Sequence, residues 1–231
     1  INSYFSASQA VSISRRNQIL LFQSKVMLSI VSRFLNPVLP MPNSSKQKQN
    51  KVTMAQRVDR HELYELSVQC YEAEVDFVMD TFKKLRGRKP ALVREDFCGT
   101  ANVCCEWVRR DKKLEAVGVD LDPEVLAWGQ QHNLAKLGDK QLKRIHLLQE
   151  DVLKVKTAAP DIVCAMNFSY WLLKERDTLK QYFKSVFEAL KADGIFFLDA
   201  YGGYDSFREL EEEREVETPD GGIVTYVWEQ A

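Results

Sequence analysis

The chain lacks the features that would place it among membrane, disulfide-rich or metal-bound proteins. No run approaches the roughly 20 uninterrupted apolar residues that a membrane span needs. The five cysteines are odd in number and form no Cys-x-x-Cys pair, and the three histidines have no ligand spacing with one another or with cysteines. We therefore expect no membrane span, no disulfide framework and no metal site, and we expect the cysteines to be small buried hydrophobes in a reducing compartment.

Acidic residues are absent from the first 58 positions, which contain eight Lys or Arg residues. All 33 acidic residues follow from Asp59 onward, against 24 basic ones, so this part carries a net charge of about −9. A surface of that sign repels a phosphate backbone, and we therefore expect no nucleic-acid partner.

The acid-free segment 1–53 is rich in Ser, Asn, Gln, Arg and Lys. This composition is typical of an organellar transit peptide, and residues 11–35 fit a basic amphipathic helix of the kind that import receptors bind. The alternative is a non-native leader, because the sequence begins at Ile1 and the true start can be Met27 or Met54. The first interpretation predicts a disordered transit peptide and a chloroplast or mitochondrial location, and the second predicts a cytoplasmic one.

From Asp59 onward, short apolar runs alternate with helical stretches of 10 to 15 residues. That alternation is typical of βαβ units, which build a parallel sheet. We therefore predict an α/β fold of the Rossmann-like type, with a doubly wound, mostly parallel sheet and helices on both faces. Strands are expected at residues 91–94, 116–121, 145–148, 161–166 and 194–200, and helices at 62–85, 102–110, 123–137 and 178–190.

The last segment is predicted to begin an insertion on the substrate side of the core. An acidic helix is expected around 207–216, a turn at 219–222 and a strand at 223–228. That strand would have an unpaired apolar edge, so we expect the C-terminus to be truncated. The predicted segments are a leader at 1–53, a helical lid at 54–90, a core at 91–203 and the incomplete insertion at 204–231.

Ligands of an open α/β sheet bind at the carboxyl ends of its strands. The loop after the first strand, 95–101, reads Glu-Asp-Phe-Cys-Gly-Thr-Ala and has one glycine where a dinucleotide-binding turn usually has three. Two carboxylates disfavour a pyrophosphate and suit a ligand with an ammonium and a sulfonium group. The loop therefore favours S-adenosylmethionine over NAD, and the alternative is a tight turn in which Gly99 serves geometry alone.

Acidic residues also follow the second and third strands. Asp120 lies 21 residues after the glycine of the first loop, close to the spacing at which an acid accepts hydrogen bonds from both ribose hydroxyls. Asp122, followed by Pro123, is predicted to be a helix N-cap. An acid in the segment 149–152 can accept from the exocyclic amine of an adenine, and the alternative is a surface loop.

The fourth strand ends in Asn167, Phe168, Ser169, Tyr170 and Trp171, where a transferable methyl group and its acceptor would meet. Aromatic faces can hold a sulfonium or a flat substrate. The alternative is that Phe168 and Trp171 pack against the next helix. No histidine falls on these loops, so the sequence names no catalytic base. The candidates on the acceptor side are Tyr170, Asp199 and Tyr201.

These motifs, in the order in which they occur along the chain, resemble those of the class I S-adenosylmethionine-dependent methyltransferases. The resemblance rests on residues 92–101, 117–123, 150–152 and 190–194 and covers roughly 59–203. It implies that S-adenosylmethionine is the cofactor. The implied contacts are Glu95, Phe97, Gly99 and Ala101 for the methionine part, Asp120 for the ribose, Leu121, Asp151 and Val152 for the adenine, and Asn167 at the end of the fourth strand.

The sequence also departs from this family. Phe97 and Ala101 replace two glycines of the usual first turn, and the antiparallel strands that normally close the sheet are absent or cut short. The first loop and the Tyr-Glu-x-Ser-Val-Gln segment at 64–69 resemble a less-studied subgroup, in which Tyr64 would lie over the cofactor as part of an N-terminal lid.

The sequence therefore predicts an S-adenosylmethionine-dependent methyltransferase that acts on a small-molecule acceptor. Two alternatives remain, an NAD-type oxidoreductase on the same fold and a non-catalytic relic that binds the cofactor. Neither the acceptor nor the oligomeric state follows from the sequence.

Overall fold

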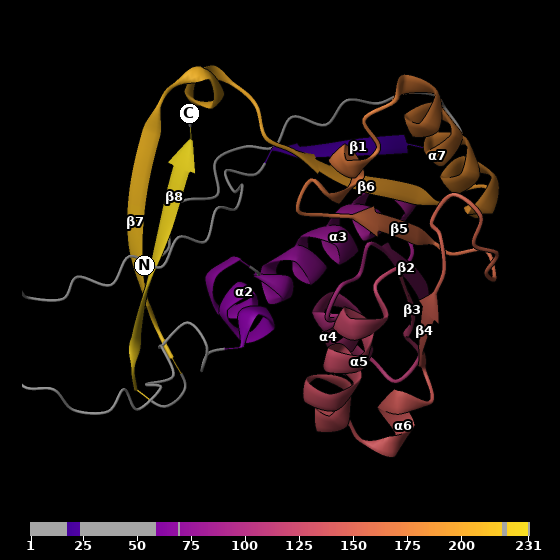
Figure 1. Ribbon diagram of the computed structural model, residues 1–231. Coiled ribbons are helices and arrows are strands. Elements are labelled where there is room, and N and C mark those ends of the chain that lie inside the picture. The colour runs from indigo at the N-terminus through magenta and orange to yellow at the C-terminus, as the bar shows by residue number, and fades with distance from the viewer. Residues whose placement is uncertain (1–17, 24–58, 69, 219–220, 231) are drawn as a thin grey trace, which may run out of the picture. The chain divides into compact units, whose positions relative to one another are not determined.

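The computed structural model describes residues 18–23, 59–68, 70–218 and 221–230, which divide between two compact units (Figure 1). The first unit comprises Ile1–Val26 and Cys70–Gly202 and holds a six-stranded sheet. The second comprises Met27–Gln69 and Gly203–Ala231 and holds a helix and a two-stranded sheet. No helix among the described residues is long and apolar enough to cross a membrane.

The six strands of the first unit all run parallel, in the order β1-β6-β5-β2-β3-β4. From β2 the chain proceeds to β3 and β4 on one side and then crosses to β5 and β6 on the other. This reversal places the switch point of the doubly wound sheet between β2 and β5. The strands are β1 (Gln18–Gln23), β2 (Leu92–Asp96), β3 (Glu115–Asp120), β4 (Ile145–Gln149), β5 (Ile162–Ala165) and β6 (Ile195–Ala200).

Helices cover both faces of this sheet, as predicted (Figure 1). Side chains alternate between the faces along each strand, so Ile195 and Phe197 of β6 join one apolar cluster and Phe196 and Leu198 join the other. The first cluster includes side chains of α3, α4 and α5, and the second includes those of α7. The helices are α3 (Tyr71–Arg86), α4 (Asn102–Arg110), α5 (Pro123–His132), α6 (Asp139–Leu142) and α7 (Arg176–Ala189), with short 3-10 turns at Leu134–Lys136 and Ser169–Leu172.

The helix predicted at 62–85 is two helices, α2 (Arg60–Val68) and α3. Cys70 precedes α3 with a non-helical backbone and, unlike the other four cysteines, is exposed. The predicted end of this helix at residue 85 lies within one residue of the observed end at Arg86. Gly87 adopts a left-handed conformation, with φ of 67°, and its N–H donates to the Lys83 carbonyl.

The strand β1 lies where the sequence predicted a basic helix. Its six residues pair in register with β6, from Gln18 opposite Ile195 to Gln23 opposite Ala200. The helix prediction was wrong at these residues, because a short apolar run has no periodicity that separates a strand from a helix. The rest of segment 1–53 lies outside the described residues, and both interpretations of it stay predictions.

The acidic helix predicted around 207–216 was also wrong, because the second unit has a strand there. β7 (Leu210–Glu217) pairs antiparallel with β8 (Ile223–Gln230) along its whole length. Arg214 lies opposite Tyr226, with its guanidinium 5.4 Å from the ring centroid. Such cross-strand contacts override the helix preference of a Glu-rich segment. The strand expected to be unpaired is therefore paired, which removes the ground for expecting truncation.

A polar cluster is buried between β2 and α7 in the first unit. Arg94 and Asp96 form an ion pair with an Nε–Oδ1 distance of 2.8 Å, and both side chains are fully buried. The Tyr182 hydroxyl donates to Asp96 Oδ2 at 2.9 Å. A buried carboxylate with these two partners is stable, whereas a buried guanidinium without its carboxylate is not.

We expect Asp96→Ala to lower the free energy of unfolding by about 3–5 kcal/mol, because the Arg94 charge would be left buried and unpaired. Tyr182→Phe removes one hydrogen bond and should cost about 1–3 kcal/mol. Urea denaturation of both variants measures the difference. An Asp96→Ala variant as stable as Tyr182→Phe would contradict the structural role of the ion pair.

Candidate cofactor site

Three residues of the loop after β2 adopt the left-handed conformation that glycine favours, although only one of them is a glycine. Phe97, Gly99 and Ala101 all have left-handed φ angles, of 59°, 52° and 59°. The Gly99 N–H donates to Asp120 Oδ2 at 2.8 Å, and the Cys98 N–H donates to the Val119 carbonyl at 3.0 Å. The loop therefore keeps the conformation of a glycine-rich turn and is fixed to the end of β3. Left-handed residues other than glycine persist only where their surroundings enforce the conformation.

Two glycines outside the loop allow this close packing. A Cβ atom on Gly118 of β3 would lie 2.9 Å from Cys98 Sγ, and one on Gly129 of α5 would lie 2.5 Å from the Thr100 carbonyl oxygen. Asn133 Nδ2 also donates to that oxygen at 3.1 Å. We did not identify Gly129 from the sequence, although a glycine inside a predicted helix is a signal of close backbone approach.

Glu95 is buried at the carboxyl end of β2, beside the N-terminus of α4. Its Oε2 accepts from the Cys104 N–H at 3.2 Å and from Cys104 Sγ at 3.1 Å. Burial raises the pKa of Glu95 to about 8, against the lowering effect of Cys104, and the charges of Glu74 and Asp120 raise it further. The structure therefore places a carboxylate, predicted to face the methionine part, where it is costly to ionise without a cation.

The neighbouring acid, Asp96, does not share this role. The sequence suggested that both carboxylates of the loop would face a cationic ligand. Asp96 instead forms an ion pair with Arg94 and accepts a hydrogen bond from Tyr182. Residues i and i+2 of a strand share one face, so Arg94 and Asp96 point to the α7 side while Glu95 points to the other.

Asp120 holds two turns at the end of β3. Its Oδ2 accepts from Gly99 and its Oδ1 accepts from the Asp122 N–H at 3.0 Å. Each oxygen retains a further lone pair, so a ribose diol can still be bound. Leu121 is 64% exposed beside it. The predicted N-cap is confirmed, because Asp122 Oδ1 accepts from Glu124 N–H at 2.9 Å.

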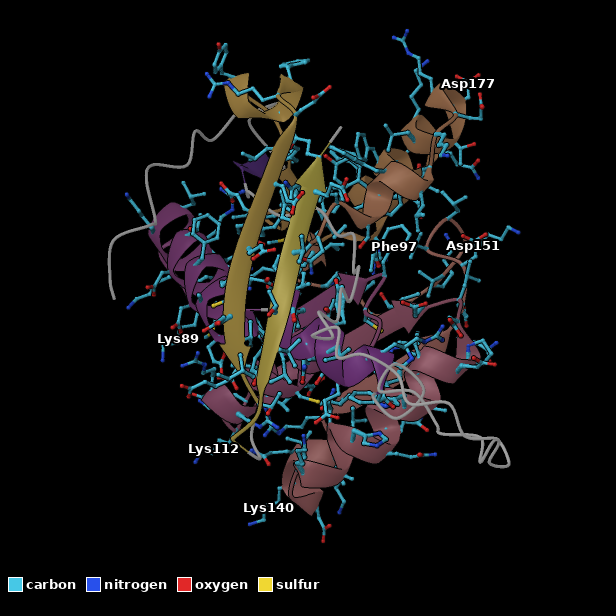
Figure 2. The ribbon with its side chains drawn as sticks, turned by 60° about the vertical axis from the view of Figure 1, so that its left-hand side comes forward. Lys89, Phe97, Lys112, Lys140, Asp151 and Asp177 are labelled. Atoms are coloured by element: carbon cyan, nitrogen blue, oxygen red, sulfur yellow. The ribbon has the colours of Figure 1, made fainter. Side chains whose placement is uncertain are left out.

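The loop after β4 lies beside the end of β3. The Glu150 N–H donates to the Asp120 carbonyl at 3.1 Å. Asp151 Oδ1 accepts from the Leu153 N–H at 2.9 Å, and Val152 is 4% exposed. Figure 2 shows Phe97 and Asp151 on loops at the carboxyl end of the sheet. The predicted ribose and adenine residues are therefore brought to neighbouring loops.

Asp199 of β6 holds the loop after β5. Its two oxygens accept from the N–H groups of Asn167, at 2.7 Å, and Phe168, at 2.8 Å, and both of these residues have φ of 55°. Asp199 is 2% exposed, and burial raises its pKa to about 6, against the lowering effect of these amides. Both oxygens of this acceptor-side candidate are thus engaged in positioning the loop.

The aromatic residues of this loop divide between the core and the surface. Tyr170 is buried and packs on Phe183 of α7, with ring centroids 6.5 Å apart. Trp171 is 43% exposed and lies 5.3 Å from Phe168, and Tyr201 lies 6.3 Å from Phe168. The ring contact with α7 is made by Tyr170, whereas Phe168 contacts Trp171 and Tyr201.

Glu74 of α3 is a further carboxyl whose charge acts with those of Glu95 and Asp199, and the sequence did not indicate it. Burial, followed by the charge of Asp199, raises its pKa to about 7. It directly precedes the buried Val75 on α3. An acid beside the apolar face of a predicted helix is a signal that could have identified it, because such a carboxylate requires a partner.

Comparisons with known proteins agree with this architecture. The profile of a family described as "Methyltransferase domain" matches residues 98–196. A protein of Bacillus subtilis (strain 168) named "Putative methyltransferase YqeM" is 29% identical over 111 residues, 46% of this chain. The match spans 41% of that relative's length.

Similar folds occur in solved structures of methyltransferases. CalS10, an amino pentose methyltransferase from Micromonospora echinaspora solved with S-adenosylmethionine, has a TM-score of 0.59 at 16% identity and covers 79% of this chain and 71% of its own. The sugar N-methyltransferase KedS8 from Streptoalloteichus has a TM-score of 0.54 at 15% identity, with 84% of each chain covered. An S-adenosylmethionine-dependent methyltransferase from Clostridium acetobutylicum ATCC 824 has a TM-score of 0.53 at 16% identity, covering 74% of this chain and 78% of its own.

Residues 98–196 of the Rossmann-like unit match the methyltransferase-domain profile, and the fold is similar to that of solved S-adenosylmethionine-dependent methyltransferases. The predicted cofactor residues lie at the carboxyl ends of β2 and β3 and in the loops after β2, β3, β4 and β5.

The raised pKa of Glu95 has a consequence for stability. Between its unfolded pKa, about 4.3, and its folded pKa, about 8, the folded state binds more protons than the unfolded state. The contribution of Glu95 to the free energy of unfolding therefore falls as pH rises through this window.

We expect Glu95→Gln to become more stable relative to the wild type as pH rises from 5 to 8, by at least about 1 kcal/mol, since one pKa unit corresponds to about 1.4 kcal/mol. Thermal or urea unfolding at several pH values measures this difference. Glu115→Gln, at an exposed position of β3, is the control and should show little change. A pH-independent difference for Glu95→Gln would contradict the buried, ligand-free carboxyl.

Proposed function

We propose that the protein transfers a methyl group from S-adenosylmethionine to a small-molecule acceptor. The observation that carries the proposal is the pair of acids Glu95 and Asp120 at the carboxyl ends of the neighbouring strands β2 and β3. Burial raises the pKa of Glu95, and the charges of other carboxylates, Asp120 among them, raise it further. Such a site is completed by a cationic ligand.

The residues present fit the cofactor. Carboxylates suit its ammonium and sulfonium groups, Asp120 suits the ribose hydroxyls, and the exposed Leu121 with Asp151 and Val152 suits the adenine. The chemistry that S-adenosylmethionine supplies is a methyl group activated by a positively charged sulfur. The task of the chain is then to align the acceptor and exclude water.

The acceptor would approach from the loops after β5 and β6. Asp199 fixes the backbone of Asn167 and Phe168 there, and Trp171 and Tyr201 lie around Phe168. Structural neighbours that are described as acting on amino pentoses, sugars and glycopeptides support a small-molecule acceptor. We name no general base, since one is needed only if the acceptor must lose a proton during attack.

The NAD-type alternative is disfavoured by Glu95. In dinucleotide-binding folds the pyrophosphate lies at the N-terminus of the helix after the first strand. Here the Glu95 carboxyl accepts a hydrogen bond from the Cys104 N–H at that place. A pyrophosphate would meet a carboxylate instead of free amides. The non-catalytic alternative predicts retained cofactor binding without methyl consumption on a metabolite extract.

The first test is thermal unfolding of the full chain with and without S-adenosylhomocysteine. Ligand at a hundredfold excess over its dissociation constant should stabilise the wild type by about 2.7 kcal/mol. Asp120→Ala should lose most of this shift, because the ribose diol loses its acceptor. Asp177→Asn, at an exposed position in the first turn of α7, is the control and should retain it.

If folded wild-type protein shows no change in unfolding temperature with S-adenosylhomocysteine, the proposal is wrong. A shift with NADH in its place would favour the oxidoreductase alternative.

A further inference from the structure

Cys104 is a buried cysteine with polar contacts, whereas the sequence predicted that the cysteines would be small buried hydrophobes. Its Sγ donates to Glu95 Oε2 at 3.1 Å, and its backbone N–H donates to the same oxygen at 3.2 Å. Cys104 is fully buried and Glu95 is 6% exposed. One residue of α4 therefore holds one oxygen of the Glu95 carboxyl with two donors.

The thiol is the donor in the side-chain contact. Burial, followed by the charge of Glu95, raises the pKa of Cys104 well above its usual value, so the sulfur keeps its proton. A thiol is a weaker donor than an amide or a hydroxyl. It can therefore fix the direction of the carboxyl while it offsets only a small part of the carboxylate charge.

The backbone contact replaces a cap that the helix lacks. The N-cap residue of α4 is Ala101, which makes no side-chain hydrogen bond to the helix. Cys104 is the third residue of α4, and its N–H is one of those that an N-cap side chain usually binds. Glu95 supplies the acceptor from β2 instead, which ties the position of its carboxyl to the start of α4.

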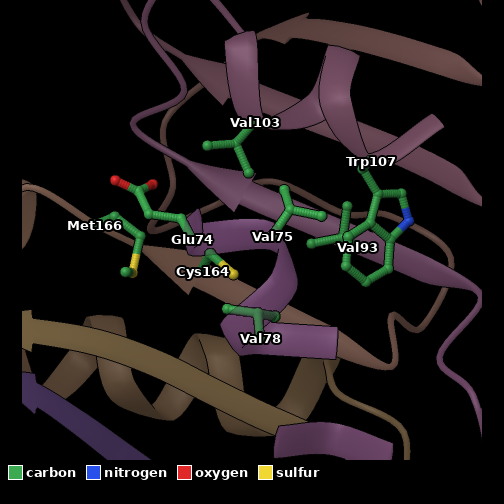
Figure 3. A pocket seen from close by; sticks show the side chains of 8 residues that line it. All are labelled: Glu74, Val75, Val78, Val93, Val103, Trp107, Cys164 and Met166. Carbon is green, nitrogen blue, oxygen red and sulfur yellow. The ribbon is translucent and has the colours of Figure 1, made fainter. Parts of the chain in front are cut away.

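The helix that carries Cys104 is itself fixed by apolar packing. Val103 and Trp107 lie one turn apart on α4 and line a small pocket together with Val78 of α3 and Val93 of β2 (Figure 3). The pocket has room for about one water molecule, so side chains fill nearly all of the space between these elements. The two donors of Cys104 therefore have a defined position relative to β2.

Two donors on one oxygen determine where the other oxygen points. The carboxyl group of a glutamate otherwise rotates about its last side-chain bond with little preference. Among the described residues, the hydrogen bonds to Glu95 all end on Oε2, so Oε1 keeps its acceptor sites. The neighbouring acids differ, because Asp96 pairs with Arg94 and both oxygens of Asp120 accept from backbone N–H groups. The carboxyl of Glu95 thus has one oxygen held and one available to a ligand.

We propose that Cys104 is a positioning residue, whose thiol holds Oε2 of Glu95 so that Oε1 is presented to the ammonium group of the methionine part of S-adenosylmethionine. This inference rests on the proposed function and adds a residue that acts through Glu95 instead of touching the cofactor. Serine distinguishes a donor from a side chain that only fills space. It keeps a hydrogen-bond donor but buries a hydroxyl, so it can replace Cys104 without loss only if the donor matters.

The experiment is calorimetric titration of the full chain with S-adenosylhomocysteine and with 5′-methylthioadenosine, which lacks the ammonium group. Cys104→Ala keeps the backbone N–H and removes the thiol. It should weaken S-adenosylhomocysteine about fivefold, because a hydrogen bond that orients Glu95 is lost, and change 5′-methylthioadenosine less than about twofold. Cys104→Ser should bind S-adenosylhomocysteine within about twofold of the wild type.

Cys105→Ala is the matched control. Cys105 is the next residue of α4 and is also fully buried, whereas the hydrogen bonds of Glu95 come from Cys104. The control removes the same sulfur atom from the same helix and should bind both ligands as the wild type does.

Infrared spectroscopy of the S–H stretching band reports the thiol contact without any ligand. The band of Cys104 is isolated as the difference between the wild type and Cys104→Ser, and that of Cys105 as the difference between the wild type and Cys105→Ala. Because hydrogen bonding to a carboxylate weakens the S–H bond, the Cys104 band should lie at the lower frequency. A Cys104 band without this shift would overturn the proposal, even if Cys104→Ala does not fold.

The outcomes of the titration separate the two proposals. If the wild type binds S-adenosylhomocysteine and Cys104→Ala binds it equally well, the role of Cys104 is wrong and the proposed function stands. A serine variant that binds no better than the alanine variant, or equal weakening of both ligands, would also overturn this role, because Cys104 would then support only the packing of the site. A folded wild type that binds neither ligand would overturn the proposed function and this inference with it.

Discussion

The burial of Glu95 at the N-terminus of α4 is the constraint on which the rest of the site depends. The carboxyl accepts the Cys104 N–H, so it takes one of the amides that a phosphate would otherwise use. The free energy cost of ionising it is high, because the carboxyl is buried and because Glu74 and Asp120 add like charge. The same arrangement therefore disfavours a dinucleotide and favours a ligand with a cationic end.

The loops around this carboxyl are held by contacts from outside the loops. Left-handed Phe97 and Ala101 are tolerated because Gly118 and Gly129 let the first loop lie directly on β3 and α5. The left-handed pair after β5 is held by both oxygens of Asp199. Strained backbone thus occurs where neighbouring strands and helices determine it, so the conformation of both loops is fixed by the fold itself.

The sequence predicted the parallel sheet, the position of its five strands after residue 90 and the N-cap Asp122, because these depend on local periodicity and turn chemistry. It failed where pairing between distant segments decides the structure. The strand β1 depends on β6, and β7 depends on β8, so neither a basic nor a Glu-rich composition revealed them. Glu74 was missed for a similar reason, since Glu95 and Asp199, whose charges act with it, are distant from it in the sequence.

The two adjacent acids Glu95 and Asp96 show how much a strand's geometry adds to a motif. The side chains of a strand alternate between its faces, so Asp96 shares a face with Arg94, two residues before it, and meets Tyr182 of α7. Glu95 points to the opposite face, towards α4. Asp96 therefore stabilises the sheet against α7, and Glu95 is left to serve the cofactor site that we propose. Arg94 and Asp96 are two residues apart, so they must share a face once the segment Arg-Glu-Asp is recognised as a strand. The different roles of Glu95 and Asp96 can therefore be inferred from the sequence and the strand prediction alone.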